Sequence, residues 1–179
     1  DLLIDIDPGM AFGTGLHEST HLCLRLLEQY VHPDYCVLDV GTGSGILSLA
    51  AARLGAKFVM GLDVDAEAIE IARENVAGNA ARFDPSLSQR IELQVGSLDT
   101  IQIVEKFDCI VMNIRPNIIL PLIPYTEAIL QTGGALIVAG ILETEGADLI
   151  HEIRAHDLLV QDHLVEGEWI AYVLSHMDN

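Results

Sequence analysis

The glycine-rich motif DVGTGSG, at residues 39–45, is the strongest candidate in the sequence for a ligand-binding site. It follows an apolar run of strand length and precedes a run of helical period, so it predicts the turn between a strand and a helix. Glycines in such a turn let the backbone bend sharply and let a ligand press against the main chain. In a doubly wound sheet this turn lies at the carboxyl edge, where nucleotide-like ligands bind. A purely structural glycine turn is the alternative interpretation.

The spacing of the glycines narrows the class of ligand. In the dinucleotide-binding fingerprint G-x-G-x-x-G, the third glycine would fall at position 46, where this chain has Ile46. The third glycine stands one residue earlier, at Gly45, which gives G-x-G-x-G. Enzymes that use S-adenosylmethionine, a cofactor without a pyrophosphate, carry this shorter form. A nicotinamide-dependent oxidoreductase is the alternative from a different class.

Asp63 supports an adenosine-type ligand, because it ends the next predicted strand, 22 residues after Gly41. An acidic side chain at that place can accept hydrogen bonds from both ribose hydroxyls. The alternative is that Asp63 or Asp65 caps the following helix. Two acids two residues apart allow both tasks, with Asp63 on the ribose and Asp65 as the cap.

A competing motif for zinc hydrolysis lies at residues 17–21, where the sequence HESTH matches H-E-x-x-H. Histidines four residues apart share one face of a helix and could bind one metal ion. The third ligand of the longer metalloprotease motif is missing, because Leu27 occupies its position. Glu28 belongs to the same predicted helix and not to a separate one. We therefore expect no metal site here.

Asn113 is the candidate catalytic residue, at the end of the predicted strand 107–112. Its amide oxygen could accept a hydrogen bond from an amine and direct the lone pair of that amine toward a methyl donor. The alternative is an asparagine that merely opens a loop before a helix.

These residues need a fold that brings strand ends together, and the hydrophobic pattern predicts one. Apolar runs of strand length alternate with helical segments, which is typical of a mostly parallel sheet with helices on both faces. Strands are predicted at 35–40, 58–62, 91–95, 107–112 and 135–140, with a closing antiparallel hairpin at 158–165 and 169–175. Helices are predicted from the glycine motif to residue 54 and at 65–78, 117–130 and 143–155, and residues 79–90 are predicted to be a loop.

The first part of the chain forms a separate lead-in at residues 1–34, ahead of a core at 35–179. The lead-in is predicted to hold a short strand at 2–6 and a helix at 17–30 that ends before His32-Pro33. We expect it to pack on the core, so that the whole chain forms one structural domain.

Composition limits the partners. The 179 residues include 9 Lys and Arg against 27 Asp and Glu, so the formal net charge is −18. Nucleic-acid affinity depends on clustered basic residues, so we expect no direct nucleic-acid binding and a basic protein as a better partner. No apolar run is long enough to span a membrane, so no membrane association is expected. The cysteines, Cys23, Cys36 and Cys109, are predicted to be free thiols, buried in apolar stretches, in a cytoplasmic protein.

Several segments together resemble one family. Residues 13–20, GTGLHEST, closely resemble the G-T-G-x-H-x-[ST]-T signature of ribosomal protein L11 methyltransferases, and residues 7–12 resemble the segment before it. The glycine motif, Asn113-Ile114, residues 140–142 and Glu168-Trp169 follow in the order of the family. The resemblance extends over nearly all 179 residues.

The resemblance implies a class I, Rossmann-like fold with a seven-stranded sheet, and S-adenosylmethionine as the cofactor. It also implies methyl transfer to a lysine side chain or N-terminal amine of a ribosomal protein, with L11 as the expected substrate. Carried over residue by residue, the cofactor contacts fall on Thr20, Gly41, Gly43, Asp63 and Asn113. Phe12 and Gly13 are expected to line the cofactor site, and Asp39 is expected to order its methionine end through water.

Two departures from the family concern the substrate. Asn113-Ile114 is followed by Arg115-Pro116, where the family has small or aliphatic residues, and a cation there could repel an ammonium group. The small amino-terminal domain that recognises the ribosomal protein in the family is expected to be absent from this chain. Lysine methyltransferases of electron-transfer flavoprotein resemble the same core and provide an alternative substrate.

Overall fold

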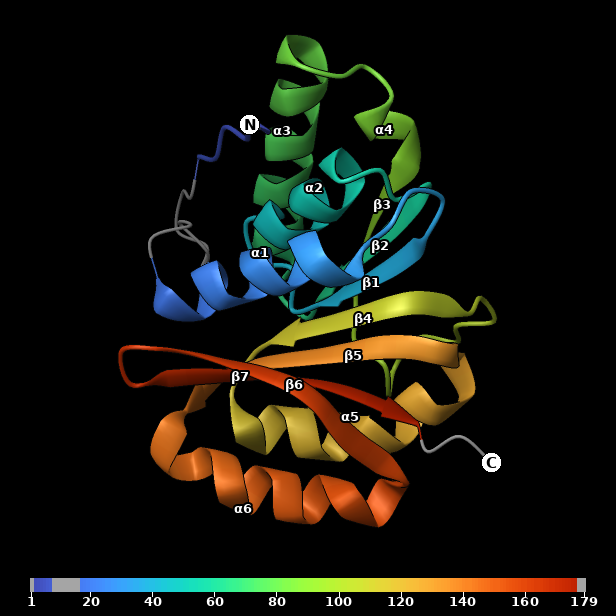
Figure 1. Cartoon of the computed structure of the whole chain (residues 1–179). Coiled ribbons are helices and arrows are strands. Elements are labelled where there is room, and N and C mark those ends of the chain that lie inside the picture. The colour runs from blue at the N-terminus through green and yellow to red at the C-terminus, as the bar shows by residue number, and fades with distance from the viewer. Residues whose placement is uncertain (1, 8–16, 177–179) are drawn as a thin grey trace.

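Seven strands form a single sheet through the middle of the structure (Figure 1). The computed structural model describes residues 2–7 and 17–176. The strands are β1 Cys36–Val40, β2 Phe58–Asp63, β3 Ile91–Val95, β4 Phe107–Asn113, β5 Leu130–Leu142, β6 Leu158–Glu166 and β7 Trp169–His176. Their order is β3-β2-β1-β4-β5-β7-β6, with β1 to β5 parallel and β7 antiparallel to both of its neighbours. The predicted parallel sheet with a closing antiparallel hairpin is confirmed.

Helices cover both faces of this sheet, as predicted. The helices are α1 Glu18–Tyr30, α2 Ile46–Arg53, α3 Ala66–Arg82, α4 Leu87–Arg90, α5 Pro116–Ile129 and α6 Glu143–Ile153, followed by a short 3-10 helix at Arg154–His156. Figure 1 shows α1, α2 and α3 on one side of the sheet and α5 and α6 on the other. Two separate clusters of buried side chains fill the two layers between helices and sheet. Strands of the centre, such as β1 and β4, are therefore mostly apolar and buried on both faces.

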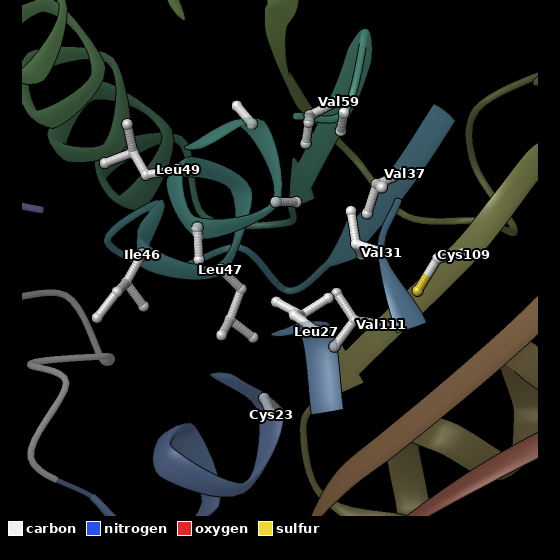
Figure 2. Close-up of a cluster of buried hydrophobic side chains, with 14 of the residues drawn as sticks. Cys23, Leu27, Val31, Val37, Ile46, Leu47, Leu49, Val59, Cys109 and Val111 are labelled. Carbon is white, nitrogen blue, oxygen red and sulfur yellow. The ribbon is translucent and has the colours of Figure 1, made fainter. Parts of the chain in front are cut away.

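The lead-in helix α1 packs on the core through one apolar face. Cys23, Leu26 and Leu27 are fully buried in the cluster that also holds residues of α2 and of the central strands. Figure 2 shows Leu27 beside Val111 of β4. Tyr30, the last residue of α1, is half-buried. This packing fixes the start of α1 against the carboxyl edge of the sheet.

The prediction of buried free thiols is confirmed for Cys23 and Cys109, but Cys36 is only half-buried. Cys23, Cys36 and Cys109 are free thiols, and Cys23 and Cys109 are buried. Burial raises the pKa of the Cys109 thiol to about 12 and also raises that of Cys23, so both stay protonated at neutral pH. No helix among the described residues is long and apolar enough to cross a membrane.

The predicted strand at residues 2–6 is wrong. The Asp5 N–H donates to Asn79 Oδ1 at 3.0 Å, and the Asp7 N–H donates to Asn75 Oδ1 at 2.9 Å. The two asparagine amides donate in turn to the Asp5 and Asp7 carbonyls. This segment, in which apolar and polar residues alternate as in a strand, therefore pairs its backbone with side chains of α3 and not with a neighbouring strand.

The predicted helix end near Gly78 and the predicted loop at 79–90 are also wrong. The helix α3 continues to Arg82, and residues 87–90 form α4. A Cβ added at Gly78 would meet nothing within 4 Å, so this glycine stands on an open face inside the helix. Asn79, which follows it, is buried and anchors the last turns by its contacts with Asp5.

Candidate active site

A cavity of about 580 Å³ lies at the carboxyl edge of the sheet. It is lined by residues at or just after the carboxyl ends of β1, β2, β3 and β4, by Gly140 of β5, and by the first turn of α1. Carboxyl ends of parallel strands meet at one edge, so residues far apart in the sequence converge there. Among the predicted site residues, the lining includes Thr20, Gly41, Gly43, Asp63 and Asn113.

The glycine loop, residues 41–45, contributes Gly41, Thr42 and Gly43 to the cavity lining. Gly41, Gly43 and Gly45 have φ angles of 77°, 53° and 84°, in the left-handed region that favours glycine. The N–H groups of Gly41 and Thr42 both donate to the Leu62 carbonyl of β2 at 2.8 Å. A Cβ at Gly41 would lie 2.5 Å from Ile114 Cγ2, so glycine is required there by space as well as by conformation.

Asp63 joins the glycine loop to the start of α3. Its Oδ2 accepts from the Gly43 N–H at 2.9 Å, and its Oδ1 accepts from the Asp65 N–H at 3.0 Å. Asp65 caps α3 by accepting from the Glu67 N–H at 2.9 Å, so the predicted capping role is confirmed. A carboxylate has about four acceptor positions, so Asp63 keeps capacity for two hydroxyl donors of a ligand.

Asn113 and Thr20 come together from β4 and α1. Asn113 Nδ2 lies 3.4 Å from Thr20 Oγ1, across 93 residues of sequence. Asn113 Oδ1 is buried and has no hydrogen-bond partner among the described residues. A buried acceptor without a partner is costly, so this oxygen is suited to receive a donor from a ligand in the cavity.

Asp39 lies beneath the loop and does not line the cavity. It is fully buried, and its Oδ2 accepts from Thr42 Oγ1 at 2.7 Å and from Ser48 Oγ at 2.8 Å. Burial raises the pKa of Asp39 to about 6, against the lowering effect of these hydroxyls, and the charge of Asp63 raises it further. Asp39 thus binds a hydroxyl of the loop, at Thr42, and one of α2, at Ser48. Because it does not line the cavity, any effect of Asp39 on a ligand is indirect.

The two histidines of the H-E-x-x-H motif have different partners. His17 precedes α1 as its N-cap, where Nδ1 accepts from the Ser19 N–H at 3.2 Å, and its ring lies edge-on to Trp169 at 4.5 Å between centroids. His21 Nδ1 lies 2.9 Å from Glu166 Oε1 of β6. In residues 2–7 and 17–176, no three His, Cys, Asp or Glu side chains are grouped as metal ligands.

The sequence prediction missed several residues of the cavity wall. His17, Gly96, Gly140 and Trp169 line the cavity but were not predicted as site residues. Gly140 has a φ of 81°, and a Cβ there would lie 2.6 Å from the Ile114 carbonyl oxygen. A glycine near the end of each of β3 and β5 was the signal that could have found Gly96 and Gly140. Phe12 and Gly13, also predicted to line the site, lie outside the described residues.

Known proteins are similar to this chain in sequence and in fold. The family model described as "Ribosomal protein L11 methyltransferase (PrmA)" matches residues 1–176. Relatives named ribosomal protein L11 methyltransferase from Heliobacterium modesticaldum and Geobacillus thermodenitrificans are 41% and 43% identical over 173 residues, 97% of this chain. The chain spans about half the length of these curated relatives, 52% and 53%.

Solved structures agree with the sequence relatives. A ribosomal protein L11 methylase from Lactobacillus delbrueckii subsp. bulgaricus has a TM-score of 0.86 at 34% identity, covering 99% of this chain and 86% of that chain. A tRNA m1G37 methyltransferase from M. jannaschii has a TM-score of 0.71 at 18% identity, covering 88% of this chain and 47% of that one, and shares the fold alone. On the match to residues 1–176 and the order of the site residues, the chain belongs to the ribosomal protein L11 methyltransferase family.

Proposed function

We propose that this chain binds S-adenosylmethionine and transfers its methyl group to amino groups of a basic protein, with ribosomal protein L11 as the substrate. The observation that carries the proposal is the convergence of Thr20, the glycine loop, Asp63 and Asn113 on one cavity. The names of the relatives supply the substrate. A ribosomal substrate also implies action in the cytoplasm.

The cavity suits the cofactor in size and in chemistry. Ligand sites of drug-sized molecules have volumes of about 300–1,000 Å³, and this cavity has about 580 Å³. Asp63 offers acceptors for the ribose hydroxyls, and Val64 and Ile118 place exposed apolar side chains on the wall. When bound, S-adenosylmethionine supplies an electrophilic methyl group on a sulfonium. Thr20 and Asn113 are then the polar groups for the methionine end.

Asn113 would orient the acceptor amine. Its unpaired Oδ1 can accept one N–H of a neutral amine, which fixes the direction of the nitrogen lone pair. A lysine with a pKa of about 10.4 must first lose a proton, which costs about 4 kcal/mol near pH 7.5. Alignment and removal of water from the amine are thus the main tasks of the protein. We assign no general base.

Charge favours a basic protein substrate over RNA. The net charge of −18 attracts a cationic protein and repels phosphates. Arg115 lines the cavity and is exposed, which places one positive charge near the path of the substrate. The cofactor proposal does not depend on this residue.

Calorimetric titration with S-adenosylmethionine and with NADH tests the cofactor assignment. We expect binding of S-adenosylmethionine alone, because Ile46 occupies the place of the third dinucleotide glycine. Asp63→Ala should weaken binding about tenfold or more, since it removes the ribose acceptor and the partner of the Gly43 N–H. Asp65→Ala is the matched control: it removes the α3 cap and should leave the dissociation constant within about twofold. Equal affinities of the unsubstituted chain and Asp63→Ala would disprove the ribose assignment.

Transfer of a tritiated methyl group tests the reaction. Purified ribosomal protein L11, a mixture of the other ribosomal proteins, and ribosomal RNA are each incubated with the chain and labelled cofactor. We expect label in L11 alone, in an acid-stable linkage to amino groups. Label in RNA would contradict the protein substrate, and label in another ribosomal protein would contradict L11.

A further inference from the structure

Asn75 of α3 connects two segments that lie far apart in the sequence. Its Nδ2 donates to the Ser44 carbonyl at 2.8 Å and to the Asp7 carbonyl at 2.9 Å. Its Oδ1 accepts from the Asp7 N–H at 2.9 Å. The side chain is 5% exposed and does not line the cavity. Both amide hydrogens and one acceptor position are therefore used within the protein.

The contact with Ser44 fixes the glycine loop from outside the cavity. Ser44 stands in the loop just before Gly45, the N-cap of α2. A Cβ at Gly45 would lie 3.1 Å from Ala72 Cβ of α3, so the helix presses against the loop there. Ala72 and Asn75 are three residues apart and share one helical face. The helix thus supports the loop by a close packing contact and by a hydrogen bond one turn apart.

Asn79 makes the same kind of contact without reaching the glycine loop. It follows Asn75 by four residues on the same face of α3, and it is 1% exposed. Its Oδ1 accepts from the Asp5 N–H at 3.0 Å, and its Nδ2 donates to the Asp5 carbonyl at 2.6 Å. Its further donor contact is with the Asn75 backbone carbonyl. Asn79 is therefore a matched control within the chain: a buried asparagine that binds the backbone of Asp5 and not the glycine loop.

We propose that Asn75 is a positioning residue for cofactor binding, whose single amide fixes the glycine loop and the backbone of Asp7 to one another. Without the amide, the Ser44 carbonyl and the Asp7 backbone lose their hydrogen bonds to Asn75 together. Cofactor binding must then order a loop that is ordered in advance in the unsubstituted chain. The proposal rests on the proposed cofactor and concerns a residue that does not touch it.

The test measures cofactor affinity and local exchange in three proteins: the unsubstituted chain, Asn75→Ala and Asn79→Ala. Affinity for S-adenosylmethionine is measured by calorimetry, and exchange of the Asp5 and Asp7 amides by NMR. Asn75→Ala should raise the dissociation constant about tenfold. Asn79→Ala should speed exchange at Asp5 and leave the dissociation constant within about twofold.

A purely structural role and a positioning role differ in how exchange responds to the cofactor. In the unsubstituted chain, saturating S-adenosylmethionine should slow exchange at Asp7 more than at Asp5, because Asn75 links Asp7 to the loop. In Asn75→Ala this response should disappear. The experiment on the unsubstituted chain needs no variant to fold.

The outcomes separate the two proposals. If the unsubstituted chain binds no S-adenosylmethionine, the proposed function fails and the positioning role fails with it. If the unsubstituted chain binds the cofactor and both variants bind it as well, only the positioning role fails. Equal weakening by Asn75→Ala and Asn79→Ala, or no cofactor effect at Asp7, would also overturn that role.

Discussion

The amide nitrogen of Asn113 lies 3.4 Å from the Thr20 hydroxyl oxygen, although 93 residues separate the two in the chain. The contact joins the first turn of α1 to the carboxyl end of β4 at the wall of the cavity. It leaves Asn113 Oδ1 buried without a partner among the described residues. The nitrogen of the amide is thus directed to the protein and the oxygen is kept for a ligand.

Asn113→Ala should lower turnover more than cofactor affinity. Loss of the oxygen removes the group that aligns the acceptor amine, and misalignment of this kind lowers the rate about 100-fold. The dissociation constant of S-adenosylmethionine should rise by less, about fivefold, because one of several contacts is lost. Single-turnover methyl transfer and calorimetry measure the two effects. Asn117→Ala, an exposed asparagine outside the cavity lining, is the control, and equal losses of turnover and affinity in Asn113→Ala would contradict the acceptor role.

Gly41→Ala should destabilise the fold more than Gly133→Ala. Both glycines have similar φ angles, 77° and 74°, so both substitutions carry the backbone cost of about 1–2 kcal/mol. A Cβ at Gly41 also meets Ile114 Cγ2 at 2.5 Å, whereas one at Gly133 meets nothing within 4 Å. Urea unfolding should show an additional loss of about 1–3 kcal/mol for Gly41→Ala. Similar losses for the two variants would show that Ile114 moves aside freely.

The buried carboxyl of Asp39 should make stability depend on pH. Its pKa is raised to about 6 in the folded protein from 3.8, so the folded state binds this proton more tightly than the unfolded state. The resulting stabilisation is fully present below pH 4 and is lost as the pH rises through 6. Compared with Asp39→Asn, which cannot titrate, the unsubstituted chain should be relatively more stable at pH 4 than at pH 7.5, by about 2 kcal/mol. Urea unfolding at the two values measures this, and a difference independent of pH would refute it.

Arg115→Met should improve the apparent affinity for a lysine acceptor. The substitution keeps an unbranched apolar stem and removes a positive charge from the cavity wall. Repulsion of an ammonium at about 4 Å is near 1 kcal/mol in water, so KM should fall about threefold to fivefold at low salt. The gain should shrink at high salt, because exposed charges are screened. Arg154→Met, at an arginine outside the cavity lining, should leave KM unchanged, and a higher KM in Arg115→Met would mean that the guanidinium binds the substrate.

Local patterns in the sequence determined most of the fold. The apolar runs and the helical segments were sufficient to predict the parallel sheet, the closing hairpin and the helices on both faces. A strand or helix that is buried on one or two faces repeats its apolar residues with a characteristic spacing in the sequence. The turn at the glycine motif and the capping role of Asp65 could also be predicted, since both depend on neighbours within a few residues. The resemblance of residues 13–20 to one family supplied the cofactor and the substrate class.

Features that depend on contacts between residues distant in the sequence were decided by the tertiary structure alone. Residues 2–6 alternate like a strand, yet their backbone pairs with Asn75 and Asn79, about 70 positions away. Asp39 stands in the motif, yet it is buried under the loop and not open to the cavity. The sequence carries no local signal for these contacts, because hydrogen bonds across the fold depend on which helix faces which segment. For the same reason, the link from Asp7 through Asn75 to the glycine loop depends on the position of α3 in the fold and could not be predicted from the sequence.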